Sequence, residues 1–588
     1  RLQGDWSSDV CSSDLFLKNK IILIHQSTLP HPYAALYTGL IFGESGIHLP
    51  KELKTLYRET GLLHLLVVSG SQVALLSGIL FTLFRSFHFS KSLTYVLLTL
   101  CNIIFYFLTG GGVSIFRAIL MNQTAIGFQF LQKCPHPLHI MALTAIVILC
   151  INPLDLYNLG ALLSFLATMS LVFGVPFIER RLPLFIPKGL KKHIAITLSP
   201  FIFTTPLLWH QFHHISWISL LSNLLVIQVV EFLVVYGFFT TLLGFFFLPI
   251  THIFNQVSWL LMSIMNGLVS YISKMPFSMI FIASHHVVVT IILYAFLVVF
   301  LLFPKWQKQL FLLFSLFIIY LCFPIFLKTP FLRVTFLDVG QGDAILIETP
   351  ARYTLLIDAG QDKKNYHTRK SVFNYGEKVV YPALQAMGIN KLDLVITSHF
   401  DNDHVGGIPF LVNAFPVGTL IDNGSDKARH FKSYKQLNQN KLQVMDQQSI
   451  VLDDGTRIQF FTPYAHHPYV RENNRSLVIK LSYKDIDFLF TGDLEDDGEI
   501  TLVSHHGNQL DVEVLKLGHH GSKTSSTAEL LKYTTPLYAV ASVGRNNRYH
   551  HPHPSVVNRL KKQGTTLFRT DQDGAVTFYT DEIGRAHV

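Results

Sequence analysis

The chain has 588 residues, half of them apolar and only 14% charged, and its formal net charge is +9. This length exceeds one ordinary domain, and the charged fraction lies well below the roughly 25% typical of soluble domains, so a single soluble domain is excluded. Five cysteines without a CxxC motif argue against a disulfide framework or a zinc finger. The positive charge fits either a polyanionic partner or lysines in cytoplasmic loops.

Both ends of the chain differ from the sequence beside them. Residues 1–15 and 582–588 resemble translated sequencing-adapter DNA, so we expect them to be artefacts and set them aside. Residues 16–60 are then expected to be the remnant of an N-terminal region that extends further in the intact protein. We predict a transmembrane domain over 61–330 and a soluble domain over 331–581, because long apolar runs end near 330.

Long apolar stretches fill the first of these domains. A membrane-spanning helix needs about 20 apolar residues, and we predict a polytopic α-helical domain with roughly eight to ten spans. The stretch 216–248 fits either one tilted helix or two short ones, and 138–151 is short enough to be re-entrant. The candidate stretches are 62–84, 92–109, 138–151, 158–177, 194–209, 216–248, 256–273, 284–303 and 309–327.

Two basic connectors predict the orientation of these spans. The segments 179–192 and 305–308 carry most of the positive charge between spans and should face the cytoplasm. Four predicted spans separate them, and one more precedes the soluble domain. The soluble domain is therefore predicted to lie outside the cytoplasm, provided that 216–248 crosses the membrane once.

Some polar residues occur where lipid would penalise them. Ionisable groups inside a membrane usually face a protein interior or a water-filled path. Arg117, which follows three glycines at 110–112, fits that role or a helix end whose side chain snorkels to the interface. The candidate channel residues are His64, Ser69, Gln72 and Arg117.

Three stretches of the apolar half resemble a known family. Residues 57–73, with Gly61, His64 and the Ser-Gly-Ser-Gln run at 69–72, are similar to the start of the competence domain of ComEC-type DNA-uptake channels. The stretches 114–121 and 152–168 are similar to two further parts of that domain. The resemblance implies a multi-pass protein of the cytoplasmic membrane that passes single-stranded DNA. Gln72 departs from the family pattern, which usually has His at this position.

The soluble half alternates short strand-like runs with polar loops. Strands are predicted at 332–337, 344–348, 354–357, 392–397, 488–491 and 512–517. Several of these runs end in Asp followed by Gly, a pattern that suits loops presenting oxygen ligands above a rigid sheet.

The strand at 392–397 leads into a cluster of potential metal ligands. His399, Asp401, Asp403 and His404 fall within six residues, and Gly406-Gly407 follows. A loop of this kind can surround two neighbouring cations, and its donors suit Zn²⁺, Mn²⁺ or Fe²⁺. Two such ions about 3.5–4 Å apart lower the pKa of a bound water and clamp both oxygens of a phosphodiester displacement.

Further candidate ligands arrive downstream in the order that such a site needs. Asp493 ends the strand at 488–491, and His519, followed by His520, comes after the strand at 512–517. We predict that Asp493 bridges two divalent metal ions and that the later histidines, among them the ligand His519, complete the second site. His551 follows in a loop with Tyr549.

These residues resemble the metal-binding motifs of the metallo-β-lactamase superfamily, to which Asp358 also corresponds. The stretches 338–343, 516–523 and 542–552 are more similar still to the hydrolase domain of ComEC-type proteins. The resemblance implies an α/β fold, the αββα sandwich, with a two-metal site and a nuclease role. From the residues themselves we predict that Asp403 and His404 are catalytic and that His551 or Tyr549 stabilises charge or aids the leaving group.

Two departures from the superfamily's HxHxDH pattern leave the metal open between Zn²⁺ and Mn²⁺. Asp401 stands in place of the second histidine, and an oxygen-richer site favours Mn²⁺. No clear metal-binding histidine lies between 405 and 492, because the histidines there are in loop-like surroundings. The residues not expected to be ligands are His430, His466, His467, His505 and His506, whereas Lys516, Lys523, Arg545 and Arg548 fit either phosphate contacts or a solvated surface.

Three functions follow from this combination. The first is a DNA-uptake channel of natural transformation, whose outward domain hydrolyses phosphodiesters of single- or double-stranded DNA beside receptor and translocation proteins. The second is a membrane-anchored metallo-hydrolase of a small ester or phosphodiester, although an anchor needs far fewer spans. The third is a domain that guides DNA without catalysis.

Overall fold

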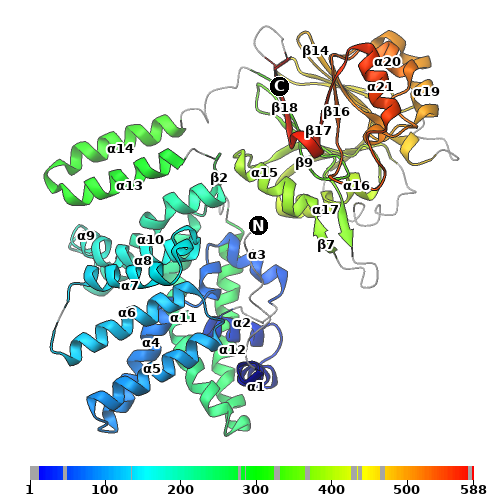
Figure 1. The fold of residues 1–588 in the computed structure, drawn as a ribbon. Coiled ribbons are helices and arrows are strands. Elements are labelled where there is room, and N and C mark those ends of the chain that lie inside the picture. The colour runs from blue at the N-terminus through cyan, green and yellow to red at the C-terminus, as the bar shows by residue number, and fades with distance from the viewer. Residues whose placement is uncertain are drawn as a thin grey trace. The chain divides into compact units, whose positions relative to one another are not determined.

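The computed structural model describes residues 12–43, 49–133, 135–275, 280–284, 287–322, 331–364, 371–424, 434, 440–463, 471–580 and 586–587. The chain forms two compact units, shown as ribbons in Figure 1. One comprises Arg1–Ile280 and His285–Leu302, and the other comprises Phe281–Ser284 and Phe303–Val588. His430, His466 and His467 lie outside the described residues.

The first unit is helical. Apolar runs punctuated by Gly, Pro and polar caps give its helices, and Ser90 at the start of α5 is one such cap, accepting the N–H of Leu93. The helices are α1 Ser12–Thr28, α2 Tyr33–Phe42, α3 Lys51–Glu59, α4 Gly70–Ser86, α5 Lys91–Leu108, α6 Val113–Phe130, α7 Pro137–Ile151, α8 Leu159–Met169, α9 Val175–Glu179, α10 Lys188–Phe212, α11 Ile218–Gly244, α12 Leu248–Ser273 and α13 Val287–Leu302.

Within the described part of the chain, three helices are long and apolar enough to cross a membrane. They are Lys91–Leu108, Leu159–Glu179 and Ile218–Gly244, and a fourth span results if α13 and the segment after it, bent by 108°, count as one. Fewer helices pass than the eight to ten spans predicted, because α4, α7 and α13 have only 17, 15 and 16 residues, whereas α6, α10 and α12 are long enough but not apolar enough. The stretch 216–248 is one helix, α11.

The span Leu159–Glu179 contains a π-turn, Ser170–Gly174, between α8 and α9. The π-turn disturbs the helical hydrogen bonds, and Ser199 of α10 donates its hydroxyl to the carbonyl of Ser170 at 2.8 Å. Gly174 allows this close approach, since a Cβ there would lie 2.0 Å from Ser199 Oγ. Small residues therefore hold these two helices together, as is common in membranes.

Helix α2 is mostly buried and contributes to the apolar core of the first unit. Its residue Tyr37 is fully buried, and the phenol oxygen lies 3.2 Å from Thr240 Oγ1 of α11 and accepts a hydrogen bond from Ser258 of α12. Gly237 of α11 leaves room for Ile41, because a Cβ at Gly237 would lie 2.2 Å from the Ile41 side chain. The core of this unit thus includes residues that precede position 60.

The second unit carries α14 Gln307–Cys322 and a sandwich of two β-sheets. The first sheet has the order β10-β9-β8-β5-β4-β3-β18-β19 and the second the order β11-β12-β13-β14-β15-β16-β17. An apolar layer that includes Phe336, Phe488 and Phe578 fills the space between them. The strands are β3 Arg333–Phe336, β4 Ile345–Glu348, β5 Thr354–Ile357, β8 Leu392–Ile396, β9 Val417–Asp422, β10 Asn440–Gln443, β11 Ser449–Val451, β12 Arg457–Phe461, β13 Val478–Tyr483, β14 Ile486–Phe490, β15 Val514–Lys516, β16 Tyr538–Ala541, β17 Thr566–Arg569, β18 Val576–Thr580 and β19 Ala586–His587.

Helices cover the sandwich on the outside. A second apolar cluster packs α19 Asp496–His506, α20 Ala528–Thr534 and α21 Pro554–Gln563 against the second sheet (Figure 1). The helices after the strands of the first sheet are α15 Tyr381–Ala386, α16 Asn402–Val405 and α17 Ile408–Ala414, and α22 Thr570–Asp573 follows β17. The αββα sandwich predicted from the sequence is confirmed.

Candidate metal centre

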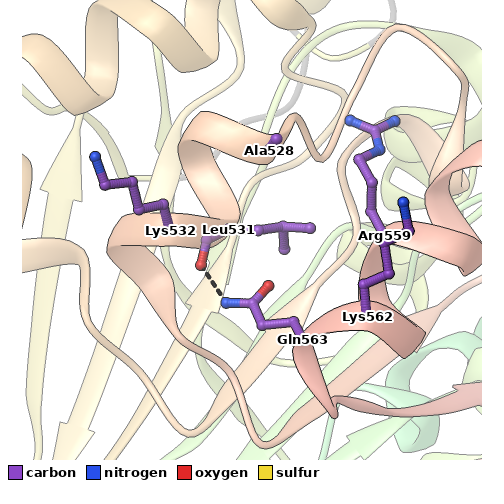
Figure 2. A pocket seen from close by; sticks show the side chains of 6 residues that line it. All are labelled: Ala528, Leu531, Lys532, Arg559, Lys562 and Gln563. Atoms are coloured by element: carbon purple, nitrogen blue, oxygen red, sulfur yellow. Dashed lines mark hydrogen bonds between the residues drawn. The ribbon is translucent and has the colours of Figure 1, made fainter.

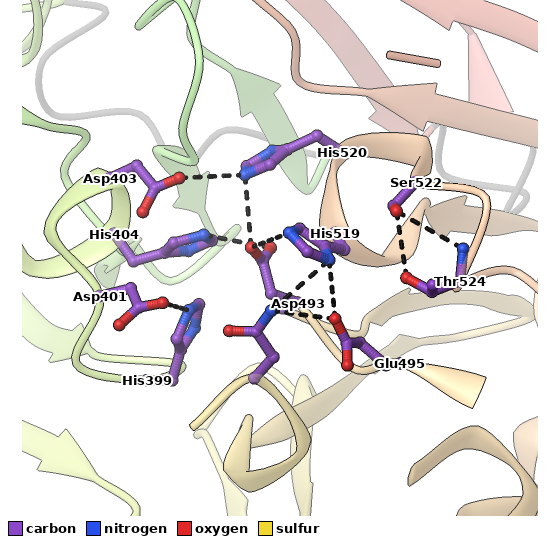
Figure 3. A network of polar contacts seen from close by, with 12 residues as sticks. His399, Asp401, Asp403, His404, Asp493, Glu495, His519, His520, Ser522 and Thr524 are labelled. Atoms are coloured by element: carbon purple, nitrogen blue, oxygen red, sulfur yellow. Dashed lines mark hydrogen bonds and ion pairs between the residues drawn. The ribbon is translucent and has the colours of Figure 1, made fainter. Parts of the chain in front are cut away.

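The polar cluster lies at one edge of the sandwich, where strands from both sheets end. Strands β5 and β8 are parallel, and so are β14 and β15, so the loops that follow each pair emerge at the same edge. Helix α16, just after β8, carries Asp403 and His404, while Asp493 follows β14 and His520 follows β15. Figure 3 shows these side chains pointing toward one another.

Four residues form one group of potential metal ligands, and Asp343, Asp358 and His404 form a second group that shares His404. Asp403, His404, Asp493 and His520 each offer one atom, and these atoms all lie within 4.8 Å of one another. His404 Nε2 is 3.1 Å from Asp493 Oδ1. His520 Nε2 is 3.5 Å from oxygens of both Asp403 and Asp493. Two carboxylates and two imidazoles in this arrangement can hold a divalent cation.

Unpaired buried atoms test whether these residues fit a metal ion. Within the described residues, His399 Nε2 and His520 Nε2 are buried and have no hydrogen-bond partner. A buried polar group left without a partner costs about 1–3 kcal/mol, so two in one cluster indicate atoms that are reserved for a ligand. The donor set therefore fits a divalent metal ion.

Two further carboxylates orient the histidines of this group. Asp358, which follows β5, lies 2.8 Å from His404 Nδ1 and accepts hydrogen bonds from the Ser398 N–H and hydroxyl. Asp343 lies 3.5 Å from His520 Nδ1. Outer carboxylates of this kind fix the ring orientation of metal-binding histidines and increase their basicity. Each imidazole consequently presents Nε2 to the centre of the cluster.

Lys516 adds a buried cation to the wall of the site. It is the last residue of β15, is 1% exposed, and forms an ion pair with Asp343. Its ammonium also lies 3.7 Å from Asp493 and donates to the Gly492 carbonyl at 2.8 Å. The sequence left two roles open for this lysine, a phosphate contact or a solvated surface residue. Its burial fits neither role.

The charges in the cluster control where protons reside. Burial, together with His404, lowers the pKa of His399 to about 3, so this imidazole is neutral. Burial alone would disfavour protonation of His520, but Asp493 and Asp343 outweigh it and raise the pKa to about 9. The carboxylates likewise raise the pKa of His404 well above its ordinary value of 6.5, against the effect of burial. The carboxylates therefore favour protonated His404 and His520, and a metal ion that bound these imidazoles would compete with protons.

The other predicted ligands lie around this group. His399 is fully buried, and its ring centroid is 4.1 Å from that of His404. Asp401 is half-exposed, with Oδ2 3.8 Å from His399 Nε2, and burial followed by Asp403 raises its pKa to about 6. His519 is 27% exposed and lies 3.8 Å from Asp493 and 3.4 Å from Glu495.

His551 and Tyr549, the two residues expected to assist catalysis, lie near His519. The ring of His551 is 5.8 Å from that of His519, and Tyr549, 65% exposed, is 5.6 Å from His551. Asn547 holds this loop by accepting the His551 N–H and donating to its carbonyl, both at 2.8 Å. Burial and the neighbouring His520 lower the pKa of His551 to about 4, so it is neutral near pH 7.

Sequence reasoning missed three residues of the cluster: His520 as a ligand, Asp343 as its orienting partner and Lys516 as a buried cation. His520 is adjacent to the chosen His519, and spacing does not separate them. Asp343 ends the Asp338–Asp343 run, where Gly342 touches the backbone of Asp403 so closely that a Cβ would lie 2.3 Å from its carbonyl oxygen. That glycine-rich run was the available signal for a buried loop.

The candidate channel residues Ser69 and Gln72 share the start of helix α4, and His64 lies before it. Gln72 is buried, accepts the Ser69 N–H at 2.7 Å and donates to the Leu40 carbonyl at 2.7 Å, so it ties the start of α4 to α2. His64 lies in a short 3₁₀ turn, with Nδ1 3.0 Å from the Gly61 carbonyl.

A basic pocket of about 340 Å³ lies between α20 and α21. Figure 2 shows Lys532, Arg559 and Lys562 around it, with Gln563 donating to the Leu531 carbonyl at 2.6 Å. The pocket carries three cations and no carboxylate among its lining residues, so its electrostatic potential attracts anions.

Comparisons with known proteins cover both units. Residues 40–307 match the family described as Competence protein, and residues 337–545 match the Metallo-beta-lactamase superfamily. ComE operon protein 3 of Bacillus subtilis (strain 168) is 29% identical over 97% of this chain and 74% of that protein. Competence protein ComA of Neisseria gonorrhoeae is 35% identical over 34% of this chain and 27% of that protein. The uncharacterized protein YcaI of Escherichia coli (strain K12) is 26% identical over 97% of this chain and 74% of that protein.

These matches agree with the resemblance noted in the sequence. The helical unit carries the competence domain, and the sandwich carries the metallo-β-lactamase domain, a fold that implies binding of divalent metal. The chain therefore combines, in one polypeptide, a domain that matches the Competence protein family with a domain that matches the Metallo-beta-lactamase superfamily.

Proposed function

We propose that this protein is a DNA-uptake channel of natural transformation that passes single-stranded DNA across the cytoplasmic membrane. The single observation that carries the proposal is the combination, in one chain, of a competence domain with a buried cluster of metal-binding carboxylates and histidines. A hydrolase anchored for a small substrate would not need the many helices of the competence domain. The homology to competence proteins supports DNA as the transported molecule.

The metallo-β-lactamase domain is proposed to hydrolyse phosphodiesters of DNA outside the cytoplasm. Its location is supported by the basic connectors of the helical unit and by α11, which forms one helix across the stretch that could have crossed twice. The basic pocket between α20 and α21 supplies a surface for a polyanion. DNA-receptor and DNA-translocation proteins are the partners that this role would require.

The cluster is proposed to hold two divalent ions, Mn²⁺ or Zn²⁺. Asp403, His404, Asp493 and His520 would hold one, and His399, Asp401 and His519 would contribute to the other. Bound divalent ions activate water and neutralise phosphate charge. Asp358 and Asp343 keep the imidazoles oriented, and His551 and Tyr549 line the rim of the site, where a neutral imidazole can accept a proton or a phenol can donate a hydrogen bond.

A transformation assay tests the proposal. The full chain is expressed in a transformable host that lacks its own channel, and transformants are counted beside variants His399→Ala and Asp403→Ala and a deletion of 331–580. Restoration by the full chain is expected, and failure to restore any uptake would overturn the channel function. A nuclease assay on the purified full chain with Mn²⁺ or Zn²⁺ separates the remaining alternatives.

Each outcome of that pair of assays has one meaning. If uptake requires the domain and His399→Ala abolishes DNA cleavage, the domain is a nuclease. Uptake that survives both point substitutions but not the deletion indicates a domain that guides DNA without catalysis. Hydrolysis of small phosphodiesters without any DNA uptake indicates the anchored hydrolase.

A further inference from the structure

Arg117 is a buried cation in the helical unit. The residue is 5% exposed and extends from α6 toward α8. Its Nε donates to Ser164 Oγ at 2.8 Å and its Nη1 to Thr168 Oγ1 at 2.7 Å. The side chain is therefore enclosed by neighbouring helices and does not extend from a helix end, which was the alternative that the sequence left open.

The partners of this guanidinium are all neutral. Besides the two hydroxyls, Nη1 lies 3.1 Å from Met121 Sδ, and the guanidinium carbon lies 5.5 Å from the centre of the Phe165 ring. In the part of the chain that the structure describes, no carboxylate lies within ion-pair distance of Arg117. Charged groups inside membrane domains are normally paired or mark the path of an ion or substrate.

The positive end of a helix lies close to the Arg117 guanidinium. Arg117 Nη2 packs close to Gly70, the first residue of the 17-residue helix α4, since a Cβ on Gly70 would lie 3.3 Å from that nitrogen. The N-terminus of a helix carries a partial positive charge, which α4 keeps although Ser69 and Gln72 cap its first turn. Two positive groups thus lie side by side, with no carboxylate beside them among the described residues, and an oxyanion that contacted both would be stabilised by both.

Hydroxyl groups surround this point on its more accessible side. Ser69 and Ser71 flank Gly70, are partly and largely exposed, and have hydroxyl oxygens 2.7 Å apart. One turn before Arg117 on α6, Ser114 donates to the Gly160 carbonyl of α8 at 3.0 Å. The three stretches that resemble the competence domain, 57–73, 114–121 and 152–168, therefore meet around one guanidinium.

We propose that Arg117 and the start of α4 form a phosphate-contact site in the helical unit, and that its ligand is a phosphodiester oxyanion of the DNA strand. The inference rests on the proposed channel function and adds to it the residue that meets the DNA backbone. Ser164 and Thr168 position the guanidinium, and Gly70, which has no side chain, lets it approach the start of α4 closely.

A binding experiment with the full chain in lipid nanodiscs tests the ligand. The probe is a single-stranded oligonucleotide, compared with the same sequence carrying uncharged methylphosphonate linkages, in a His399→Ala background that limits cleavage. Arg117→Gln is expected to weaken binding of the phosphodiester strand about tenfold and to leave binding of the uncharged strand unchanged. The control is Arg85→Gln, which removes an exposed arginine that donates only to the Phe89 carbonyl among the described contacts. Equal affinity of Arg117→Gln and the parent for both strands would overturn the site.

The same variants in the transformation assay separate this inference from the channel function. If the unaltered chain does not restore uptake, the proposed function itself fails. If it does, Arg117→Gln should lower transformants about tenfold while Arg117→Lys, which keeps the charge, retains more. Unfolding temperatures of the protein in nanodiscs test whether Arg117 only holds the helices together. If Arg117→Gln and Arg117→Lys both lower the unfolding temperature and neither changes the binding of the charged strand relative to the uncharged one, the inference is contradicted. A response to anionic lipid content but not to the oligonucleotide would assign the site to a lipid headgroup and also overturn it.

Discussion

The ammonium of Lys516 is buried against the carboxylate of Asp343, and that carboxylate in turn faces His520. This pair stands within the wall of the metal centre although neither residue belongs to the group of four potential ligands. It supplies a fixed positive charge beside Asp493, 3.7 Å away. The protein thus balances part of the negative charge of the cluster with its own cation.

Replacing Lys516 by methionine is expected to destabilise the sandwich domain by about 3–5 kcal/mol, because Asp343 would be left as a buried, uncompensated charge. The measurement is the unfolding temperature of the domain within the full chain, followed by its protection from protease. Lys523→Met, at an exposed position seven residues along, is the matched control and should change neither. Unchanged unfolding of Lys516→Met would show that Asp343 is neutral in the folded domain.

His520 is expected to contribute more to metal affinity than His519, which the sequence favoured. His520 is buried and faces two carboxylates at 3.5 Å, whereas His519 is 27% exposed and lies 3.8 Å from Asp493. Changing His520 to Ala should lower Mn²⁺ affinity by more than the roughly 10- to 100-fold that loss of an outer partner costs. Calorimetric titration of the two single variants provides the comparison, and a larger loss in His519→Ala would reverse the assignment.

The sequence predicted the strands and the loop cluster because both depend on local pattern. Strand β8 and the His399–His404 run are adjacent in the chain, so a buried strand that leads into polar donors indicates a site at its end. The choice between His519 and His520 depends on backbone that turns through positive φ at both residues, 46° and 57°. No periodicity fixes which of two such side chains points inward.

Lys516 and the helical unit show where local pattern is insufficient. All three residues of β15 are buried, including Lys516, because Asp343 from a distant part of the chain pairs with the lysine. Tertiary pairing of this kind leaves no mark on either segment alone. Apolar runs likewise predicted where helices occur, but the length of each helix depends on turns such as the one before α4, where Gln72 bonds both Ser69 and Leu40.

The substitution Asp401→His is expected to shift metal preference from Mn²⁺ toward Zn²⁺. Asp401 lies 3.8 Å from His399 and occupies the position of a histidine in the superfamily's commonest motif. An imidazole in its place makes the donor set richer in nitrogen, which favours zinc. Competition titrations with both ions on the variant and the parent chain give the ratio of affinities, and an unchanged ratio would mean that Asp401 is not a ligand.

Glu499 is expected to make the stability of the sandwich domain dependent on pH. The side chain is fully buried in α19, and its carboxylate accepts the backbone N–H groups of Ser526 at 2.5 Å and Thr527 at 2.7 Å. Burial outweighs these bonds and raises the pKa of Glu499 from its ordinary 4.5 to about 7. Between these two pH values the folded domain holds a proton that the unfolded chain releases, so stability should fall as pH rises through this window and level off above it.

The variant Glu499→Gln isolates this effect, since an amide does not titrate. Between about pH 5 and about pH 8 the parent domain should lose about 2–3 kcal/mol that the variant does not lose, as the pKa shift requires. Urea unfolding at the two pH values, monitored by circular dichroism, measures the free energy of unfolding of both proteins. Glutamine offers one acceptor oxygen to the two N–H groups. Near pH 8 the variant should therefore be less stable than the parent only if the hydrogen bonds of the ionised carboxylate add more stability than burial of its charge removes. Parallel pH curves for the two proteins would instead show that Glu499 is ionised throughout, with the two N–H groups sufficient to offset its burial.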